Sequence, residues 1–226
     1  RDRSPSRGLG DVYKRQAIDT EQLIKDTAMK LFFGEGRFNA TTQEIADAAG
    51  VNRTLINYYF RSRDNLFNTV FDEAQQKEQQ RTEIIVFSNL PLREKISQHL
   101  DMFLEQSKQY PYLDIYMVTQ MNQGCVFKDT ESMNRMLDKF YLEIALEMDK
   151  GNIRKMRPEQ FLLNFISLCS FPISMRPLLQ ETMGFGDEAY QRLLEERKQI
   201  ILDMLFIHNE EQEVFENPFN LNINKK

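Results

Sequence analysis

Metal-binding and disulfide-forming side chains are scarce in this sequence. Its 226 residues include two cysteines, two histidines and no tryptophan. Cys125 and Cys169 lie far apart, with neither a C-x-x-C pair nor a histidine pair nearby, which favours free thiols in a reducing cytosol. His99 and His208 are isolated as well. The sequence therefore predicts no disulfide and no metal site, and we expect no cofactor.

Long apolar runs and a basic excess are also missing. The longest uncharged run, QFLLNFISLCSFPISM at residues 160–175, is shorter than the roughly 20 residues of a membrane span and contains Asn164 and Pro172. We read it as a buried helix. No signal peptide is visible, so we expect a cytoplasmic protein without a membrane partner. The net charge of -5 excludes a surface coated in positive charge, but it permits a local nucleic-acid patch.

Motifs of catalysis are absent. The sequence has no glycine-rich phosphate loop, no nucleophile elbow and no H-E-x-x-H. Acidic pairs such as Glu195-Glu196 and Glu210-Glu211 stand among other polar residues, as on a solvated face. We therefore expect a protein that is not an enzyme.

What is present is helical periodicity. Apolar residues recur at helical spacing from Asp19 onward, and no alternating strand pattern of useful length occurs. The sequence predicts an all-α fold, with Gly and Pro residues separating the helices. After a first helix and two short ones, the expected helices cover about 64–80, 91–109, 111–124, 129–149, 158–183 and 187–208.

The two ends differ from the rest. Residues 1–16 are rich in Arg, Ser and Gly, with five basic and two acidic residues. They are either a basic arm that touches DNA or a non-native remnant, and we favour the remnant. The polar, Asn-rich residues 209–226 are expected to fray.

Residues 40–66 have the pattern of a helix-turn-helix. Thr41 or Thr42 is a suitable N-cap for a short helix, and Gly50 can adopt a positive φ at the turn that follows. Asn52 can then cap the next helix, whose Leu55 and Ile56 face inward. The competing interpretation is an ordinary helical hairpin that only packs against its neighbours.

The chemistry of the second of these helices favours DNA. The segment from Gly50 to Arg63 contains three arginines, Arg63 included, and no acid, although the whole chain is acidic. Arginine can fork to guanine edges or to phosphate, and asparagine pairs with adenine edges. Threonine and tyrosine hydroxyls commonly contact phosphates.

The run TTQEIADAAGVNRTLINYYFRSRDNLF resembles the DNA-binding domain of the TetR family of bacterial transcriptional regulators. The features shared are a threonine-led helix, the turn from Ala46 to Val51, the aromatic triplet ending at Phe60, and the cap that begins at Ser62. The resemblance covers about fifty residues; beyond them only length and helical layout agree. Many members have Tyr at the position of Asn57 and Lys at that of Arg63, so Asn57 is expected to alter base preference.

The resemblance implies a role for each matching position. The DNA backbone would be contacted, near the N-terminus of the first helix of the motif, by Thr41, Thr42 and Gln43. Base edges would be met by Arg53, Thr54 and Asn57. Phosphates or thymine methyls would be met by Tyr58 and Tyr59, and a phosphate by Arg63.

The C-terminal part is rich in Met and aromatic residues. Their simplest interpretation is a plain core. Family members usually hold a small-molecule cavity here, and such side chains adapt to varied apolar ligands. The resemblance therefore implies an effector pocket, for which the candidate residues are Phe103, Tyr116, Met117, Met121, Met136, Phe140, Phe165 and Cys169.

The last two helices, at about 158–183 and 187–208, carry broad apolar stripes. Either these stripes are buried within one subunit, or they pair with a second copy in the four-helix interface that the resemblance implies. We favour the homodimer. Pro172 and Pro177 should kink or end the first of the two helices.

These inferences lead to a hypothesis of function. Residues 17–64 would form the DNA-binding domain and residues 65–208 the effector-binding and dimerisation domain. The chain would act as a homodimeric repressor, released from a palindromic operator by a small, largely apolar ligand. Two alternatives remain open: an activator or ligand-free regulator, and a helical apolar-ligand carrier or interaction module whose helix-turn-helix is purely structural.

Overall fold

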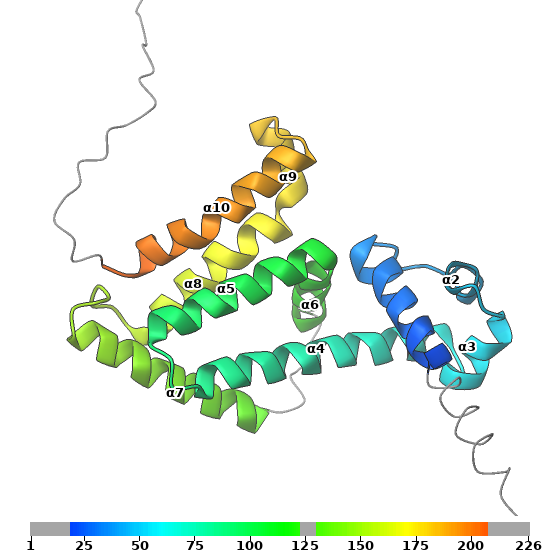
Figure 1. Ribbon diagram of the computed structural model, residues 1–226, viewed down its shortest axis with the longest axis horizontal. Helices are drawn as coiled ribbons and strands as arrows, with labels where there is room; N and C mark the ends of the chain where they lie inside the picture. The colour runs from blue at the N-terminus through cyan, green and yellow to red at the C-terminus, as the bar shows by residue number, and fades with distance from the viewer. Residues whose placement is uncertain (1–18, 123–129, 208–226) are drawn as a thin grey trace, which may run out of the picture.

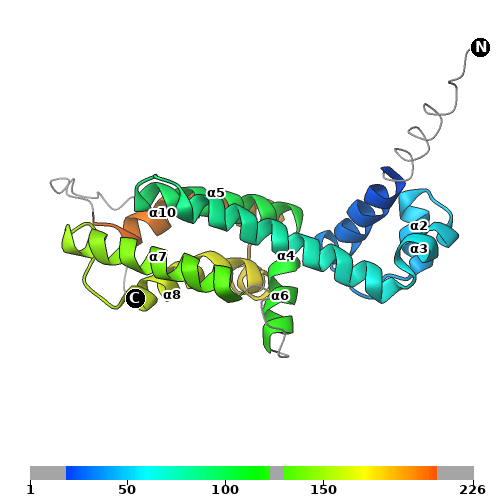
Figure 2. The same ribbon diagram turned by 90° about the horizontal axis from the view of Figure 1, so that it is seen from below.

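The computed structural model describes residues 19–122 and 130–207. The predictions for residues 1–16, Cys125, His208 and the tail at 209–226 lie outside these ranges. Within them the chain is helical and contains no strand, so the all-α prediction is confirmed. Figures 1 and 2 show an elongated molecule with a small group of N-terminal helices at one end and a helical bundle at the other.

The N-terminal group begins with helical residues 19–29, which continue into a π-helical turn, η1 (Lys30–Gly34). Two short helices follow, α2 (Thr42–Ala49) and α3 (Arg53–Phe60). They pack around a cluster of buried side chains that we call the N-terminal cluster: Ile24, Ala28, Leu31, Phe32, Phe33, Ala40, Ile45, Ala46, Ile56, Phe60, Leu66, Phe67, Val70, Phe71 and Leu113. Because this cluster includes the first turns of the next helix, the small helices are anchored firmly to that helix.

Helix α4 (Arg63–Phe87) connects the two ends of the molecule. We expected it to stop near residue 80, and that boundary was wrong by seven residues. The sequence between 80 and 87 contains no Gly or Pro, and Val86 is buried against the C-terminal helices. The helix therefore continues until Ser88, whose extended backbone ends it.

The bundle consists of α5 (Leu92–Gln109), α6 (Leu113–Asn122), α7 (Thr130–Asp149), α8 (Pro158–Ser174), α9 (Arg176–Met183) and α10 (Asp187–Leu205). Its buried side chains form a second group, the C-terminal cluster: Val86, Leu92, Ile96, Leu100, Met136, Phe140, Ile144, Met148, Ile153, Phe161, Phe165, Cys169, Ile201, Leu202, Leu205 and Phe206. Helix α5 packs on α10, α4, α7 and α8, and so runs through the middle of the bundle.

The expected single helix over 158–183 is two helices. Pro172 lies inside α8, which continues past it and ends at Ser174, and Pro177 occupies the first turn of α9. The two helices meet at an angle of 71°. The first amides of a helix have no partner within the helix, so a proline in the first turn removes no hydrogen bond. Pro177 therefore favours a new helix start at this point. In the described residues no single helix is long and apolar enough to cross a membrane; only the bent pair α8–α9 meets the length and composition criteria together.

Helix α6 links the two ends of the molecule through its opposite faces. The Tyr116 ring lies 5.0–5.7 Å from the rings of Phe33, Phe38, Phe67 and Phe71, all in the N-terminal group or the start of α4. Two residues earlier, the Asp114 carboxylate accepts hydrogen bonds from two hydroxyls of α8, at Ser170 and Ser174. Residues two apart point to different sides of a helix, so α6 packs against both ends of the molecule at once.

Candidate nucleic-acid interface

The turn between α2 and α3 has the geometry that the sequence predicts. Thr41 caps α2 in a capping box: its hydroxyl accepts from the Glu44 amide at 3.2 Å, and the Glu44 carboxylate accepts from the Thr41 amide at 2.8 Å. Gly50 has φ 66° and donates its amide to the end of α2. Asn52 caps α3 by accepting from the Thr54 amide at 2.9 Å. These contacts fix α3 relative to α2 without help from side chains on its outer face.

Glu44 is held as a carboxylate by its neighbours. Its pKa is lowered, chiefly by the hydrogen bond from the Thr41 backbone amide, then by the Thr41 hydroxyl and by the guanidinium of Arg37. Arg37 was not among the predicted site residues. It reaches from the loop before α2 to the Glu44 carboxylate and so stabilises the start of α2.

The α3 helix divides into a buried and an exposed face. Ile56 and Phe60 belong to the N-terminal cluster, and Leu55 packs against it. The exposed face carries Arg53, Thr54, Asn57 and Tyr58, and the Tyr58 side chain is 77% exposed. Because the buried residues anchor the helix, its polar face is presented to solvent as a fixed surface.

The predicted DNA-contact residues on α3 differ in the exposure of their side chains and in the contacts that orient them. Arg53, Asn57 and Tyr58 are exposed, whereas Tyr59 is half-buried, with its ring 5.1 Å from that of Tyr58. The Thr54 hydroxyl donates to Asn52 Oδ1 at 2.7 Å, which orients this side chain.

On α2, the predicted residues are placed at its exposed N-terminal turn. Gln43 is exposed and donates to Asp47 at 2.7 Å, while Thr42 is half-buried. Thr41, Thr42 and Gln43 thus lie beside the free amides of the first turn of α2, where a helix favours an anionic partner.

Arg63 has a different environment from the other predicted residues. Its Nε donates to the Ala40 carbonyl at 3.3 Å, and its Nη1 lies 3.1 Å from Asp64 Oδ1. The guanidinium carbon lies 5.2 Å from the ring centre of Phe32 and 5.0 Å from that of Phe67. The side chain is 29% exposed and is turned toward the N-terminal cluster.

The eight candidate pocket residues are not gathered at one place. Four of them, Met136, Phe140, Phe165 and Cys169, belong to the C-terminal cluster, and Phe103 packs against it. The other three are on α6: Tyr116 and Met117 pack against the N-terminal cluster, and Met121 is exposed. The sequence could not separate these groups, because the aromatic and Met residues of α6 have the same composition as those of the core.

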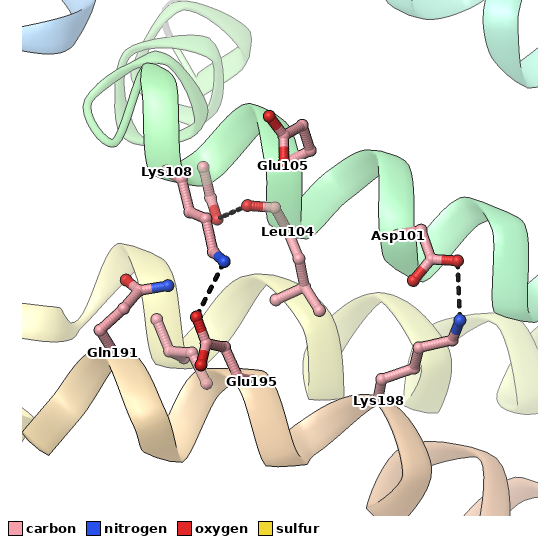
Figure 3. A pocket seen from close by; sticks show the side chains of 9 residues that line it. Asp101, Leu104, Glu105, Lys108, Gln191, Glu195 and Lys198 are labelled. Carbon is pink, nitrogen blue, oxygen red and sulfur yellow. Dashed lines mark hydrogen bonds and ion pairs between the residues drawn. The ribbon is translucent and has the colours of Figure 1, made fainter.

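None of the eight candidates lines either of two cavities found in the described part of the chain. One, of about 280 Å³, lies between α5 and α10, where Lys108 pairs with Glu195 at 2.9 Å and Lys198 with Asp101 at 2.7 Å (Figure 3). These two ion pairs join α5 and α10 across the groove. The other, of about 380 Å³, lies between residues 22–29, α4 and the end of α5.

Side-chain burial perturbs two titratable groups near the C-terminal cluster. Burial lowers the pKa of His99, whose ring lies 5.4 Å from that of Phe165, to about 4. Burial also raises the pKa of the Cys169 thiol to about 12. Both groups are therefore neutral near pH 7, which suits an apolar interior.

Comparison with known proteins agrees with this geometry. Residues 24–70 match the sequence model of "Bacterial regulatory proteins, tetR family". The chain is 37% identical over 62 residues to "HTH-type transcriptional regulator AcrR" of Shigella flexneri, covering 27% of this chain and 29% of that protein. It is 34% identical over 92 residues to "Probable acrEF/envCD operon repressor" of Escherichia coli K12, covering 41% and 35%. The match thus spans about a third of each relative's length.

Solved structures extend the likeness to most of the chain, at the level of fold. A regulator "of the TetR/AcrR family" from Thermobifida fusca aligns with 82% of this chain and 97% of its own, at TM-score 0.54 and 14% identity. The protein AibR, solved "in complex with isovaleryl coenzyme A and operator DNA", aligns with 83% and 98%, at TM-score 0.58 and 12% identity. Over residues 24–70, this chain is therefore similar to the bacterial regulatory proteins of the tetR family.

Proposed function

We propose that this protein is a homodimeric, sequence-specific DNA-binding regulator, most simply a repressor, with α3 as its recognition helix. The observation that carries the proposal is the exposed face of α3. It presents a cation, an amide and a tyrosine on a helix whose opposite face is anchored by Ile56 and Phe60. This is the side-chain chemistry that reads base edges and contacts phosphates in the major groove.

In this proposal the two hydrophobic clusters correspond to two domains with different functions. Residues 17–64 form the DNA-binding domain, and residues 65–208 bind effector and dimerise. The first turns of α4, through Phe71, contribute to the N-terminal cluster, so the shared helix moves with the DNA-binding end. A rotation of α4 therefore changes the position of α3.

The dimer would form through α8 and α10. Exposed apolar side chains lie along both helices: Leu163, Ile166 and Phe171 on α8, and Ile200 and Met204 on α10. Met204 is 64% exposed and Leu163 56%, which is costly in water for a single subunit. Pairing these two helices with those of a second copy would bury the apolar stripes and present two α3 helices to a palindromic site.

Effector control would act through the C-terminal cluster and α6. Five candidates for the pocket lining share one apolar neighbourhood and are kept: Phe103, Met136, Phe140, Phe165 and Cys169. Helix α8 carries Phe165, Cys169 and the two serines that bind Asp114. A ligand that displaced α8 would therefore act on α6, and through Tyr116 on the DNA-binding end. Ligand binding would lower operator affinity by favouring one of two arrangements.

The test is DNA binding by the purified dimer as a function of salt. We expect affinity for a palindromic fragment from its own promoter region to fall steeply with salt. Arg53→Ala should lower specific affinity by roughly 1–3 kcal/mol and relax base preference, if Arg53 makes a bidentate base contact. Arg154→Ala, which removes an equal charge in the exposed loop before α8, is the matched control and should leave base preference unchanged.

The rival function is a helical carrier of apolar ligands with a purely structural helix-turn-helix. That function predicts ligand binding without salt-sensitive binding to any duplex, and no effect of Arg53→Ala beyond charge. Catalysis is not part of either proposal, and we propose that the chain is not an enzyme.

A further inference from the structure

The backbone at Arg61 is strained. Arg61 has φ 64° and ψ -38°, and in the described residues it is the one non-glycine residue with positive φ. The Ser62 amide donates to the Phe60 carbonyl at 2.7 Å, which closes a three-residue turn around Arg61. Such a γ-turn with positive φ is rare and strained.

The strain follows from how closely α3 and α4 are joined. Helix α3 ends at Phe60, and Ser62 already caps α4 by accepting from the Asn65 amide at 3.1 Å. Phe60 and Leu66 are both buried in the N-terminal cluster, which fixes the two helix ends. The chain therefore changes direction at one residue, and it does so with a positive φ.

Glycine adopts this conformation without steric cost, whereas any residue with a Cβ does not. Arginine in such a position contributes nothing to the turn itself. Its side chain is exposed to solvent, and its amide bonds to the Asn57 carbonyl at 3.0 Å, one helical turn back. Strained residues cluster at functional sites, and here the strained residue carries a cation at the end of the exposed face of α3.

Arg63, two residues further on, is directed the other way. Its guanidinium packs beside the rings of Phe32 and Phe67, and its Nε donates to the Ala40 carbonyl. These contacts attach the loop before α2 to the first turn of α4. A phosphate at this group would compete with the contact from its Nε to the Ala40 carbonyl and with the ion pair to Asp64.

We propose that Arg61, not Arg63, makes the phosphate contact at the end of the recognition helix, and that the γ-turn holds it in place. Arg63 is then a positioning residue, which stabilises the helix-turn-helix on α4. Asn57 faces base edges in the proposed complex, and Arg61 follows it by one turn, at the edge of the groove where the phosphate backbone lies. The inference rests on the proposed DNA-binding function and assigns a residue within it.

The experiment compares four proteins: wild type, Arg61→Gly, Arg61→Lys and Arg63→Met. The probe is a duplex that the wild-type dimer selects from a random-sequence library, and affinity is measured from 50 to 200 mM salt. Melting temperature is measured in the absence of DNA. Arg61→Gly removes both the strain and the charge, whereas Arg61→Lys keeps both. Arg63→Met keeps the apolar stem beside the two rings and removes the charge.

We expect Arg61→Gly to raise Tm by about 2–4 °C, because a glycine relieves the strained turn. The same variant should bind the duplex about tenfold more weakly per protomer at 0.1 M salt, and its salt slope should fall by about 0.9 per protomer. Arg61→Lys should keep the wild-type slope. Arg63→Met should lower Tm and leave the slope unchanged.

Each other outcome has a definite meaning. An unchanged salt slope for Arg61→Gly, with wild-type binding intact, overturns the inference but leaves the proposed function standing. A slope lowered by Arg63→Met assigns the phosphate contact to Arg63 instead. A lower Tm for Arg61→Gly overturns the claim of strain. Absence of salt-sensitive wild-type binding to any duplex overturns both the inference and the proposed function.

Discussion

Lys95 provides a sharp test of what holds the bundle together. It is 1% exposed, and its ammonium donates to the Val86 carbonyl at 2.7 Å and to both oxygens of Glu143, at 2.7 and 2.9 Å. Val86 lies in the last turn of α4, where carbonyls have no partner within the helix. One side chain of α5 thus caps α4 and ties it to α7.

The environments of Lys95 and Glu143 predict an asymmetry between the two single substitutions. Glu143→Leu leaves a buried ammonium with one acceptor, which should cost about 3–5 kcal/mol of unfolding free energy. Lys95→Met costs less, about 1–3 kcal/mol, because it chiefly leaves the Val86 carbonyl unpaired. Glu143 is 20% exposed and retains Lys139 at 2.8 Å, so it tolerates the loss of Lys95. The double variant replaces the pair by apolar side chains and should be no worse than Lys95→Met alone.

The assay is urea unfolding of all four proteins at one protein concentration, because the stability of the proposed dimer would depend on that concentration. The control is the exposed pair Lys198–Asp101 in the α5–α10 groove (Figure 3), whose side chains are 33% and 60% exposed. Lys198→Met and Asp101→Leu should each cost less than about 1 kcal/mol. The reasoning is refuted if Glu143→Leu costs no more than Asp101→Leu, or if the double variant loses the sum of its single variants.

Three further predictions concern single residues. The His99 pKa of about 4 lies below the unfolded value of 6.5, so the unfolded chain takes up the proton first as the pH falls. The free energy of unfolding should therefore fall by up to about 3 kcal/mol between pH 6.5 and 4. His99→Gln should remove that part of the loss, as measured against wild type by urea unfolding at pH 7.5 and 4.5. Because burial raises the Cys169 pKa to about 12, its thiol should react with a disulfide reagent at pH 8 only when the protein unfolds. The Cys169→Ala variant measures the contribution of Cys125. Rapid labelling of Cys169 in the native protein would contradict its burial. Gly36 has φ 70°, and a Cβ there would lie 3.0 Å from the Tyr112 ring, so Gly36→Ala should lower Tm, whereas Gly186→Ala, with open space around it, should have a much smaller effect.

The helices and the turn of the recognition motif could be predicted because their signals are local. Thr41, Gly50 and Asn52 act on amides within a few residues, and each has the expected capping or turn geometry. The ends of longer helices depended on distant contacts. Helix α4 continues to Phe87 because Val86 packs in the C-terminal cluster and Lys95 satisfies its carbonyl, neither of which is visible between residues 80 and 87.

The candidate pocket could not be resolved for a related reason. Composition identifies adaptable apolar side chains, but not the body against which they pack. Tyr116 on α6 and Phe165 on α8 are both aromatic residues of the bundle, yet the first packs against the N-terminal cluster and the second belongs to the C-terminal cluster. Helix α6 is short and contacts both ends of the molecule, so its side chains belong to two environments. An aromatic residue that joins two bodies has the same local sequence signal as one that lines a cavity.

The arginines on either side of Ser62 show the same limit at the candidate site. By charge alone, Arg61 and Arg63 are equal cations at the end of α3, and the family resemblance assigns the phosphate contact to Arg63. Two distant features separate them. Phe32 and Phe67 form a surface over which the Arg63 guanidinium lies, and the tight junction between α3 and α4 forces Arg61 into a γ-turn that directs it to solvent. A positive charge in a motif therefore predicts a phosphate contact only when the backbone at that residue leaves the side chain free, and in this chain the strained residue is the free one.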